Sequence, residues 1–424
     1  NIYYMLTPDG HYYNFSGCGN AMNCNHPIMR KFIIDCLRYW VMEYRVDGFR
    51  FDLASILTRD QNGAPMPDPP ILQGIACDPI LGHVKLIAEA WDAAGLYQVG
   101  TFPAFRRWSE WNGRYRDDMR RFLKGDGSMA GTAINRIIGS TDLYDPVHRG
   151  ESASVNFLTC HDGFTLYDLY SYNTKHNEKN GEENRDGSDY NYSWNCGAEG
   201  PTRKKKIVEL RKQLIKNAYL LLFLSQGVPL LMAGDEFGNS QDGNNNAYCQ
   251  DNDITWLKWD WMYSTNKTRE MRRLETVSRL VALRKSLDLY HHEDFFTRLT
   301  QIGLLKPSSR VQWFLPDGTT PMERDWFDLG VRSFTMRLLS NSEVDVCIVV
   351  NGTADDRTFR LPPDTHWTPK WCSAEINGRR AGHGTQVEEC DLNGDTTVWT
   401  QHVPDASETV LKMVEEVAMQ RTES

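Results

Sequence analysis

Several sequence features are missing from this chain of 424 residues, and each absence excludes a class of protein. Ten cysteines are present but none forms a CxxC pair, which argues against a zinc site and against a disulfide framework. No apolar run approaches the ~18 residues of a membrane span. We therefore expect free, buried thiols in a reducing compartment, no membrane partner and no bound metal.

Strongly basic segments are also scarce, and the net charge is −9. Lysine and arginine are scattered along the chain, whereas nucleic-acid-binding proteins gather them on one surface. The one dense basic stretch, residues 203–206, precedes apolar residues at helical spacing, and we interpret it as the solvated start of a helix. We expect no nucleic-acid partner.

Up to about residue 290, short apolar runs alternate with longer segments of helical periodicity. Such alternation is typical of βα units that build a parallel sheet. The segment 27–44 shows the helical pattern clearly, with a proline at its start. The predicted helices are 27–44, 115–123, 206–224 and 269–287, and the predicted strands are 45–51, 84–91, 108–112, 154–160 and 228–233.

Beyond about residue 290 the helical periodicity is replaced by short alternating runs separated by turn residues. The predicted strands here are 310–315, 332–339, 344–351, 357–361 and 396–403. They predict a C-terminal antiparallel β-sandwich domain over residues 291–424. Residues 1–290 would then be the C-terminal portion of a (β/α)8 TIM barrel, an α/β fold, with about the last five of its eight strands.

The segment VDGFRFD, residues 46–52, ends the first predicted strand. Because side chains alternate between the faces of a strand, Arg50 and Asp52 project to one face, and Phe49 and Phe51 to the other. The charged pair would face the barrel axis at the carboxyl end of the strand, where the active sites of such barrels lie. An arginine so close favours the ionised carboxylate, which suits a nucleophile.

Two further acidic residues follow apolar strands. Glu89 ends the strand in LIAEAWD, and the desolvation expected there raises the pKa of a carboxylic acid, which suits a proton donor. In VNFLTCHDG a buried run ends in His161 and Asp162, which can both point into a cleft. Any one such acid is more often a helix cap or an ion-pair partner, but three in order are hard to explain structurally.

These segments resemble the second, third and fourth signature regions of the α-amylase superfamily, in the form found in isoamylases and glycogen-debranching enzymes of glycoside hydrolase family 13. VDGFRFDLAS, LIAEAWD and VNFLTCHDGFTL carry the resemblance. It continues through NFSGCGNAMNCNHP, WSEWNGRYRD and AGDEFGNSQDGNNNAYCQDN, so that it spans residues 1 to about 290. The later region is similar to the family's C-terminal domain only in position and pattern.

The resemblance implies a role for each of these residues. Asp52 matches the family's nucleophile, Glu89 its general acid/base and Asp162 its transition-state stabiliser; Arg50 matches the arginine that accompanies the nucleophile, and His161 the histidine that contacts the sugar. The implied reaction is a retaining double displacement, for which the carboxyl groups of nucleophile and acid/base should lie ~5 to 5.5 Å apart. We expect no cofactor.

The substrate implied is a branched α-glucan such as glycogen, a limit dextrin or amylopectin, cleaved at its α-1,6 branch linkages. The 1,6 preference comes from the resemblance alone, because sister enzymes that hydrolyse α-1,4 bonds or form branches share the same three carboxylates. A non-catalytic glucan-binding scaffold subunit is the alternative from another class, although such proteins usually show a replaced catalytic acid. We expect a cytoplasmic location, with a plastid as the alternative, and the oligomeric state is left open.

Two features of the family have no counterpart here, namely its first signature region and its N-terminal β-sandwich. The chain also starts at Asn1 without a methionine, so we interpret it as a fragment. A barrel with an open side exposes apolar strand faces and unpaired strand edges. We therefore predict that this chain alone folds poorly and has little activity.

Aromatic and polar segments near these motifs are further candidates. Trp91 is the leading candidate for a substrate contact, since aromatic rings stack on sugars, and Trp108 and Trp111 are plausible ones. The long polar loop 177–197 is predicted to line the cleft, with a surface excursion as the alternative. Segment 242–253 does not match the EF-hand spacing, so we expect it to hydrogen-bond sugar or backbone. Gly234-Asp235-Glu236 could cap the next segment and is given no catalytic role.

Overall fold

The computed structural model describes residues 1–145, 149, 151–287, 311–339, 346–353, 355–362, 367–372, 389–393 and 396–401. The chain separates into two compact units. The first comprises Asn1–Arg116, Ile138–Phe157 and Gln226–Leu230, and the second comprises Asp117–Ile137, Leu158–Ser225 and Leu231–Ser424. The domain boundary expected near residue 290 lies outside the described residues.

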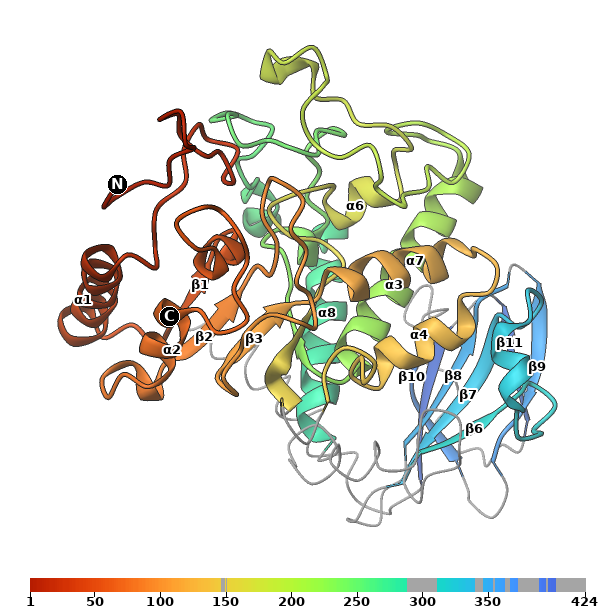
Figure 1. Ribbon diagram of the computed structural model, residues 1–424. Helices are drawn as coiled ribbons and strands as arrows, with labels where there is room; N and C mark the ends of the chain where they lie inside the picture. The colour runs from red at the N-terminus through yellow and green to blue at the C-terminus, as the bar shows by residue number, and fades with distance from the viewer. Residues whose placement is uncertain are drawn as a thin grey trace. The chain divides into compact units, whose positions relative to one another are not determined.

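The first unit is built on a parallel sheet of five strands in the order β1-β2-β3-β4-β5, of which β1 to β3 are labelled in Figure 1. The strands are β1 (Gly48–Phe51), β2 (Lys85–Ala88), β3 (Trp108–Trp111), β4 (Ser154–Asn156) and β5 (Val228–Pro229). Parallel neighbours in sequence order are the product of successive βα units. The predicted parallel sheet is therefore confirmed, and β1 and β5 stand at its two ends among the described residues.

Pairing between β1 and β2 determines which residues leave the sheet side by side. Phe51 is level with Ala88 in the parallel register, and the Glu89 N–H donates to the Phe51 carbonyl at 3.1 Å. Asp52 and Glu89 therefore follow their strands at the same level. At the other end, a Cβ on Gly48 would lie 2.7 Å from the Cβ of Lys85, so only glycine allows the strands to approach this closely there.

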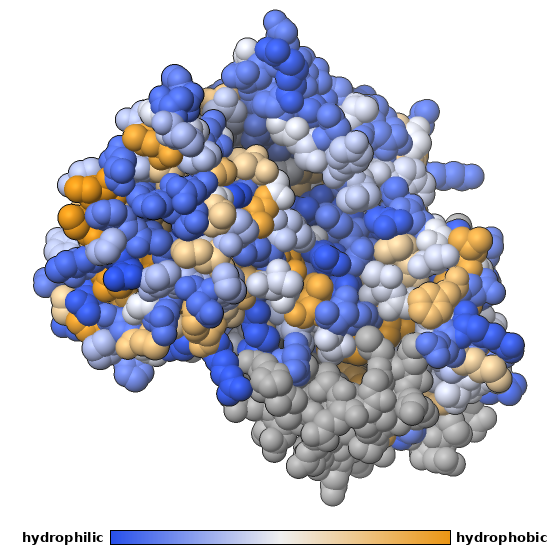
Figure 2. Space-filling model, viewed as in Figure 1, coloured by the Kyte–Doolittle hydropathy of each residue, from blue (hydrophilic) through white to orange (hydrophobic). Residues whose placement is uncertain are grey.

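Helix α1 (Pro27–Tyr44) precedes β1 and has the bounds that its periodicity predicts. Its inner side buries Met29 and Leu37, and further apolar residues of the helix pack partly against the core. Its outer side is also apolar: Ile28 is 53% exposed and Phe32 is 58% exposed. Hydrophobic side chains accordingly gather over α1 on the face shown in Figure 2. The helix is thus apolar on two sides, which distinguishes it from an ordinary amphipathic surface helix.

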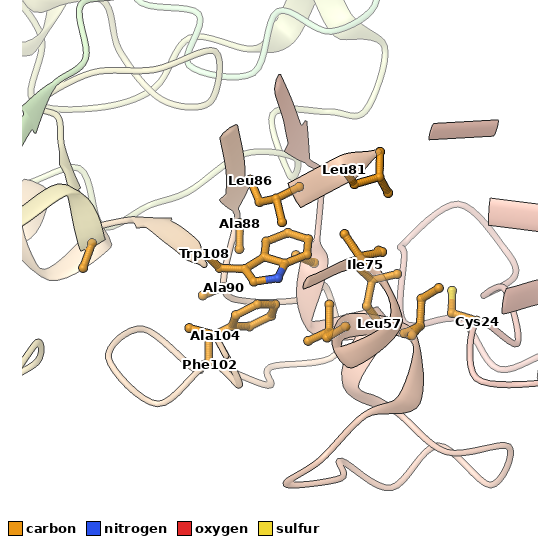
Figure 3. Close-up of a cluster of buried hydrophobic side chains, with 14 of the residues drawn as sticks. Cys24, Leu57, Ile75, Leu81, Leu86, Ala88, Ala90, Phe102, Ala104 and Trp108 are labelled. Atoms are coloured by element: carbon orange, nitrogen blue, oxygen red, sulfur yellow. The ribbon is translucent and has the colours of Figure 1, made fainter. Parts of the chain in front are cut away.

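The core of the first unit lies around Trp108, together with β2 and α2 (Pro70–Ala76). Figure 3 shows the indole among Phe102, Ala88 and Ala90. The Trp108 ring centroid lies 4.8 Å from that of Phe51, and Trp108 is 2% exposed. The interpretation of Trp108 as a substrate contact is therefore wrong, because strand alternation turns this side chain into the core and sends Trp111 to the opposite face.

Helices and loops dominate the first half of the second unit. α3 (Gly113–Lys124) passes into it from the first unit, and α4 (Ala130–Ile137), α6 (Leu166–Leu169), α7 (Lys205–Leu224) and α8 (Arg269–Ser286) belong to it. α7 is buried from Asn217 to Leu224, and Arg284 of α8 donates to the Ser225 carbonyl at its end at 2.9 Å. The predicted helices 206–224 and 269–287 are confirmed to within one residue at each end. Of the helices that the structure describes, none is long and apolar enough to cross a membrane.

Antiparallel strands occupy most of the described residues of the second unit beyond Leu287 (Figure 1). One sheet has the order β10-β12-β8-β7-β6, and β11 pairs with β9. The bounds are β6 (Val311–Phe314), β7 (Ser333–Leu338), β8 (Val346–Asn351), β9 (Asp356–Arg360), β10 (Trp367–Cys372), β11 (Glu389–Asn393) and β12 (Thr396–Gln401). Val349 of β8, Phe359 of β9 and Trp367 of β10 share one buried cluster, so the two sheets pack together. The predicted antiparallel strands are confirmed.

All five parallel strands are shorter than the sequence suggests: the strand expected over 45–51 begins at Gly48, and that expected over 84–91 ends at Ala88. The strand expected over 154–160 ends at Asn156, and that expected over 228–233 ends at Pro229. Residues 157–160 are nevertheless buried. After β4 the apolar run continues because the chain stays in the core, and hydrophobicity reports burial without reporting strand pairing. Residues 230–233 after β5 are half-buried or exposed, so burial does not explain that run.

The cysteines correct a second expectation. Of the eight whose side chains the structure describes, all are free thiols, but only Cys24, Cys160, Cys196 and Cys347 are buried. Cys18, Cys36, Cys77 and Cys249 are exposed. The expectation of buried thiols therefore holds for half of them.

Candidate active site

Arg50 and Asp52 project from one face of β1 at its carboxyl end. Arg50 Nη1 donates to Asp52 Oδ1 at 2.7 Å. Phe49 and Phe51 pack against the core cluster on the opposite face. The predicted alternation of side chains is confirmed. It leaves the Asp52 carboxylate 68% exposed, whereas the Arg50 side chain is 27% exposed.

Glu89 follows β2 at the level of Asp52 and has a side chain that is only 2% exposed, as its position after an apolar strand predicts. Arg50 Nη2 lies 2.5 Å from Glu89 Oε1, an ion-pair contact that lacks the alignment of a hydrogen bond. One guanidinium thus contacts both carboxylates. Burial favours the neutral form of Glu89, whereas the adjacent arginine favours the ionised form.

The backbone after Asp52 also holds Glu89. The Leu53 N–H donates to Glu89 Oε2 at 2.9 Å, and the Ala54 N–H donates to the Glu89 carbonyl at 2.8 Å. Leu53 has a φ of 43°, in the left-handed region that costs a side-chain-bearing residue ~1–3 kcal/mol. This bend aims two consecutive N–H groups at Glu89. A leucine in that conformation carries no sequence signal.

Trp111 lies against Arg50. The guanidinium carbon of Arg50 is 4.1 Å from the centroid of the Trp111 ring, within the range of a cation–π contact. The Trp111 ring in turn contacts Phe157, with centroids 5.6 Å apart. The indole therefore packs against Arg50, the arginine that contacts both carboxylates.

Trp91, the predicted substrate contact, lies in the same unit as Asp52 and Glu89. Its ring stacks on Tyr97, with centroids 6.1 Å apart and an interplanar angle of 13°. The loop between them is braced by Asp92, which accepts two backbone N–H groups and pairs with Arg59 at 2.6 Å. Trp91 is therefore held on a well-braced loop.

Sequence reasoning missed a buried ion pair on the core side of β3. Glu110 accepts from Arg149 Nη2 at 2.6 Å and from the Gly100 N–H at 2.7 Å. Burial raises the pKa of Glu110, and the charge of Arg149 opposes that rise. A charged residue between two tryptophans in WSEW was the available signal, because burial of a lone carboxylate requires a partner.

His161 and Asp162 belong to the second unit. His161 Nε2 lies 3.6 Å from Asp162 Oδ1, and the two side chains are 52% and 64% exposed. The residues on both sides, 153–160 and 164–166, are buried. A buried run therefore ends in an exposed pair, and that the pair points into a cleft stays a prediction.

The polar loop and the asparagine run are tied to each other within the second unit. Asn177 Nδ2 donates to Asn245 Oδ1 at 2.8 Å, and the Asn245 N–H donates back to Asn177 Oδ1 at 2.9 Å. Asn245 also donates to the Ser188 carbonyl at 2.8 Å. Backbone hydrogen bonding was expected of this run. Within either unit by itself, the described residues include no group of three His, Cys, Asp or Glu side chains placed to hold a metal ion.

The chain is similar in sequence to isoamylases and to glycogen operon proteins. It is 50% identical over 394 residues to isoamylase 1, chloroplastic, of Arabidopsis thaliana, a match that covers 87% of this chain and 47% of the relative. It is 44% identical over 390 residues to isoamylase SU1, chloroplastic, of Zea mays, with 86% and 47% covered. It is 40% identical over 379 residues to the glycogen operon protein GlgX homolog of Haemophilus influenzae, with 87% and 53% covered. The chain thus spans about half the length of the curated relatives it matches.

The fold is similar to that of solved pullulanases. The pullulanase from Bacillus acidopullulyticus matches with a TM-score of 0.65 and 21% identity over 94% of this chain and 43% of that one. The pullulanase of Anoxybacillus sp. LM18-11 complexed with maltotetraose matches with a TM-score of 0.64 and 22% identity over 94% and 50%. At these identities the likeness concerns the fold. Among models of protein families, none matches the chain.

Proposed function

Because this chain belongs to the isoamylase and GlgX debranching-enzyme family of the α-amylase superfamily, we propose that its parent protein hydrolyses the α-1,6 branch linkages of α-glucans. The observation that carries the proposal is the shared contact of Arg50 with Asp52 and Glu89 at the carboxyl ends of adjacent parallel strands. Two carboxylates so close, one exposed and one buried, suit a nucleophile and a proton donor of a retaining glycosidase.

In this mechanism Asp52 attacks the anomeric carbon while Glu89 protonates the glycosidic oxygen that leaves. The product of this step is a covalent glucosyl ester of Asp52. The ionised Glu89 then takes a proton from water, which attacks the ester and releases the sugar with its original configuration. A carboxyl separation of ~5 to 5.5 Å between Asp52 and Glu89 stays a prediction of this scheme.

The single positive charge of Arg50 serves both steps, because it can stabilise the negative charge of Asp52 in the first and of Glu89 in the second. Before the first step the charge of Asp52 balances that of Arg50, so that buried Glu89 can remain protonated. Esterification removes the charge of Asp52, and Arg50 then stabilises the ionised Glu89 that must act as a base. The contacts of both guanidinium nitrogens support this sharing of one cation.

Three further residues receive roles by family resemblance. Asp162 is proposed to stabilise the transition state and His161 to contact the sugar; their exposure at the tip of a buried segment supports both roles. Trp91 is proposed as a stacking surface for a glucose ring. Its ring is already stacked on Tyr97, which would keep it in a fixed orientation.

The proposed architecture is a (β/α)8 barrel to which this chain contributes about the last five strands, followed by a β-sandwich. The five parallel strands in sequence order and the two packed antiparallel sheets support it. The proposed substrates are glycogen, its limit dextrins and amylopectin. Plant relatives are named chloroplastic and bacterial ones are named glycogen operon proteins, so we infer a plastid or the bacterial cytoplasm as the compartment.

A chimera provides the test. The 394 residues of Arabidopsis thaliana isoamylase 1 that match this chain would be replaced by it, and the product incubated with amylopectin. We expect linear maltooligosaccharides with no new branch points, and little activity from this chain alone. Asp52→Asn and Glu89→Gln should each abolish release, with Asp9→Asn, an exposed acid on the same unit, as the control. Wild-type rates in the Asp52→Asn chimera would refute the nucleophile assignment.

A further inference from the structure

The segment 158–166 of the second unit presents two exposed side chains from a buried frame. Residues 158–160 and 164–166 are buried, whereas His161 and Asp162 are exposed. Gly163, between them and the second buried stretch, has a φ of 96°, which turns the chain back. The position of Asp162 therefore depends on what holds the two buried ends.

One carboxylate holds both ends. Asp235, which is 1% exposed, accepts the Leu166 N–H on Oδ1 at 2.9 Å. Its Oδ2 accepts the hydroxyl of Thr159. The Tyr219 hydroxyl donates to the Asp235 carbonyl and so fixes the backbone from which this carboxylate projects.

Other contacts hold the segment at single points. The Gly163 N–H donates to the Asn245 carbonyl at 2.9 Å, and Arg120 Nε donates to the Leu158 carbonyl at 2.8 Å. Each of these fixes one position, whereas Asp235 joins Thr159, two residues before the exposed pair, to Leu166, four residues after it. Its burial leaves it no path to a sugar, so any effect on catalysis must act through the segment.

We propose that Asp235 is a positioning residue that clamps residues 159 and 166 together and thereby holds Asp162 and His161 in their working geometry. The proposal rests on the proposed function, in which Asp162 stabilises the transition state. A displacement of ~1 Å in a catalytic group can cost on the order of 10²-fold in rate, so a clamp of this kind affects turnover more than substrate binding.

The charge state of Asp235 makes the local opening of this segment depend on pH, which an ordinary structural residue would not do. Burial raises the pKa of Asp235 to about 7, against the opposing hydrogen bonds from Thr159 and Leu166, and Asp168 and Glu236 raise it further as like charges. A local opening that rehydrates Asp235 restores its ordinary pKa near 4. Opening therefore becomes easier as pH rises from about 4 through about 7, and levels off above that.

Hydrogen–deuterium exchange measured by mass spectrometry on the chimera tests the clamp. Asp235→Ala should lower the protection of the peptide 158–169 by at least about tenfold relative to peptides of α7. Asp235→Asn should keep it within about threefold, because the amide oxygen can accept from Leu166 and the amide NH2 can donate to Thr159. In the wild type the protection of this peptide should fall with rising pH between 4 and 7, by at most about tenfold per unit for one proton, and Asp235→Asn should flatten this slope.

Neighbouring variants make the result specific. Glu183→Gln, which changes an acid of the same unit that is 82% exposed, should leave the protection of the peptide unaffected, and Thr159→Val should lower that protection about threefold or more. If Asp235→Ala does not fold, the clamp is tested by the protection lost in Thr159→Val and by the pH dependence of protection in Asp235→Asn. If Asp235→Ala left the protection of peptide 158–169 unchanged, or lowered the protection of the α7 peptides equally, the proposed clamp would be wrong.

Turnover by the chimera supplies the functional readout. Asp235→Ala should lower kcat by about 10- to 100-fold and change KM by less than about threefold, and Asp235→Asn should restore kcat to within about threefold. A pure rise in KM would contradict a positioning role. If the wild-type chimera releases no glucan, the proposed function fails, and the exchange data still decide the clamp.

Discussion

The guanidinium of Arg50 lies over the indole of Trp111, with its carbon 4.1 Å from the ring centroid, while its two terminal nitrogens reach Asp52 and Glu89. A cation–π contact of this kind is worth ~0.5–2 kcal/mol. Its larger consequence is geometric, because a guanidinium backed by a ring has few orientations, and only some of them reach both carboxylates.

Loss of the indole should therefore impair turnover. In the chimera, Trp111→Leu should lower kcat by roughly tenfold, which corresponds to ~1.4 kcal/mol, and Trp111→Phe should lower it less because a smaller aromatic face remains. Steady-state kinetics on amylopectin measures both. The matched control is Trp40→Leu on the exposed side of α1, where the indole is 46% exposed. Equal rates for the two leucine variants would contradict the role given to Trp111.

Asp92 should be a large contributor to stability. Its side chain is fully buried and pairs with Arg59, whose side chain is 9% exposed. Asp92→Ala leaves a buried arginine without its partner, and we expect a loss of ~3–5 kcal/mol in the free energy of unfolding, measured by urea denaturation. Asp35→Ala breaks an exposed ion pair with Lys31 and should cost less than ~1 kcal/mol. Similar losses for the two variants would show that the buried pair is not decisive.

Glu199 should make the second unit sensitive to acid. Burial alone would raise the pKa of Glu199, but the N–H groups of Asn173 and Thr174 and the amide of Asn195 lower it to about 2. A lowered pKa means that the ionised form stabilises the fold fully above about pH 4.5, and that this stability is lost as pH falls toward 2.

Glu199→Gln should remove this dependence. Between pH 7 and pH 3 the wild type should lose more thermal stability than the variant, and the variant should be less stable at pH 7. Thermal melts followed by circular dichroism at the two pH values measure the difference. Glu183→Gln, at a side chain that is 82% exposed, is the control and should behave as the wild type. Parallel pH profiles for wild type and Glu199→Gln would refute the assignment.

The outer side of α1 should promote self-association of the isolated chain. Phe32 is 58% exposed, and the aromatic residues Tyr39, Trp40 and Tyr44 contact one another at the end of the helix. Exposed apolar patches of this kind favour association. Phe32→Glu should increase the monomeric fraction, measured by light scattering, without lowering the melting temperature.

The adjacent position provides the comparison. Ile33 packs partly against the core, so Ile33→Glu should destabilise the chain by ~2 kcal/mol or more, because it buries a charge among apolar side chains. A fully monomeric wild type at high concentration would contradict the prediction for Phe32.

Much of the fold follows from periodicity that the residues themselves carry. The bounds of α1, the existence of five parallel strands and the alternation that separates Arg50 from Phe49 all depend on spacing along the chain, which is a local property. The lengths of β4 and β5 were overestimated because pairing depends on a neighbour that the local sequence does not specify. The exposure of four cysteines was missed for the same reason.

The candidate site divides in the same way. Sequence by itself determined which acids are proposed as catalytic, since Asp52, Glu89 and Asp162 follow apolar strands and stand in family motifs, and it determined that Glu89 would be buried. Only the tertiary structure decided what holds them: Trp111 behind Arg50, the left-handed Leu53 that turns its N–H to Glu89, and Asp235 beneath the segment of Asp162. The hydrogen bonds to Glu89 and Asp235 join residues that are 36 and 69 positions apart in the chain, and Leu53 adopts an unfavourable backbone angle. Neither a long-range contact nor a strained angle leaves a local pattern in the sequence.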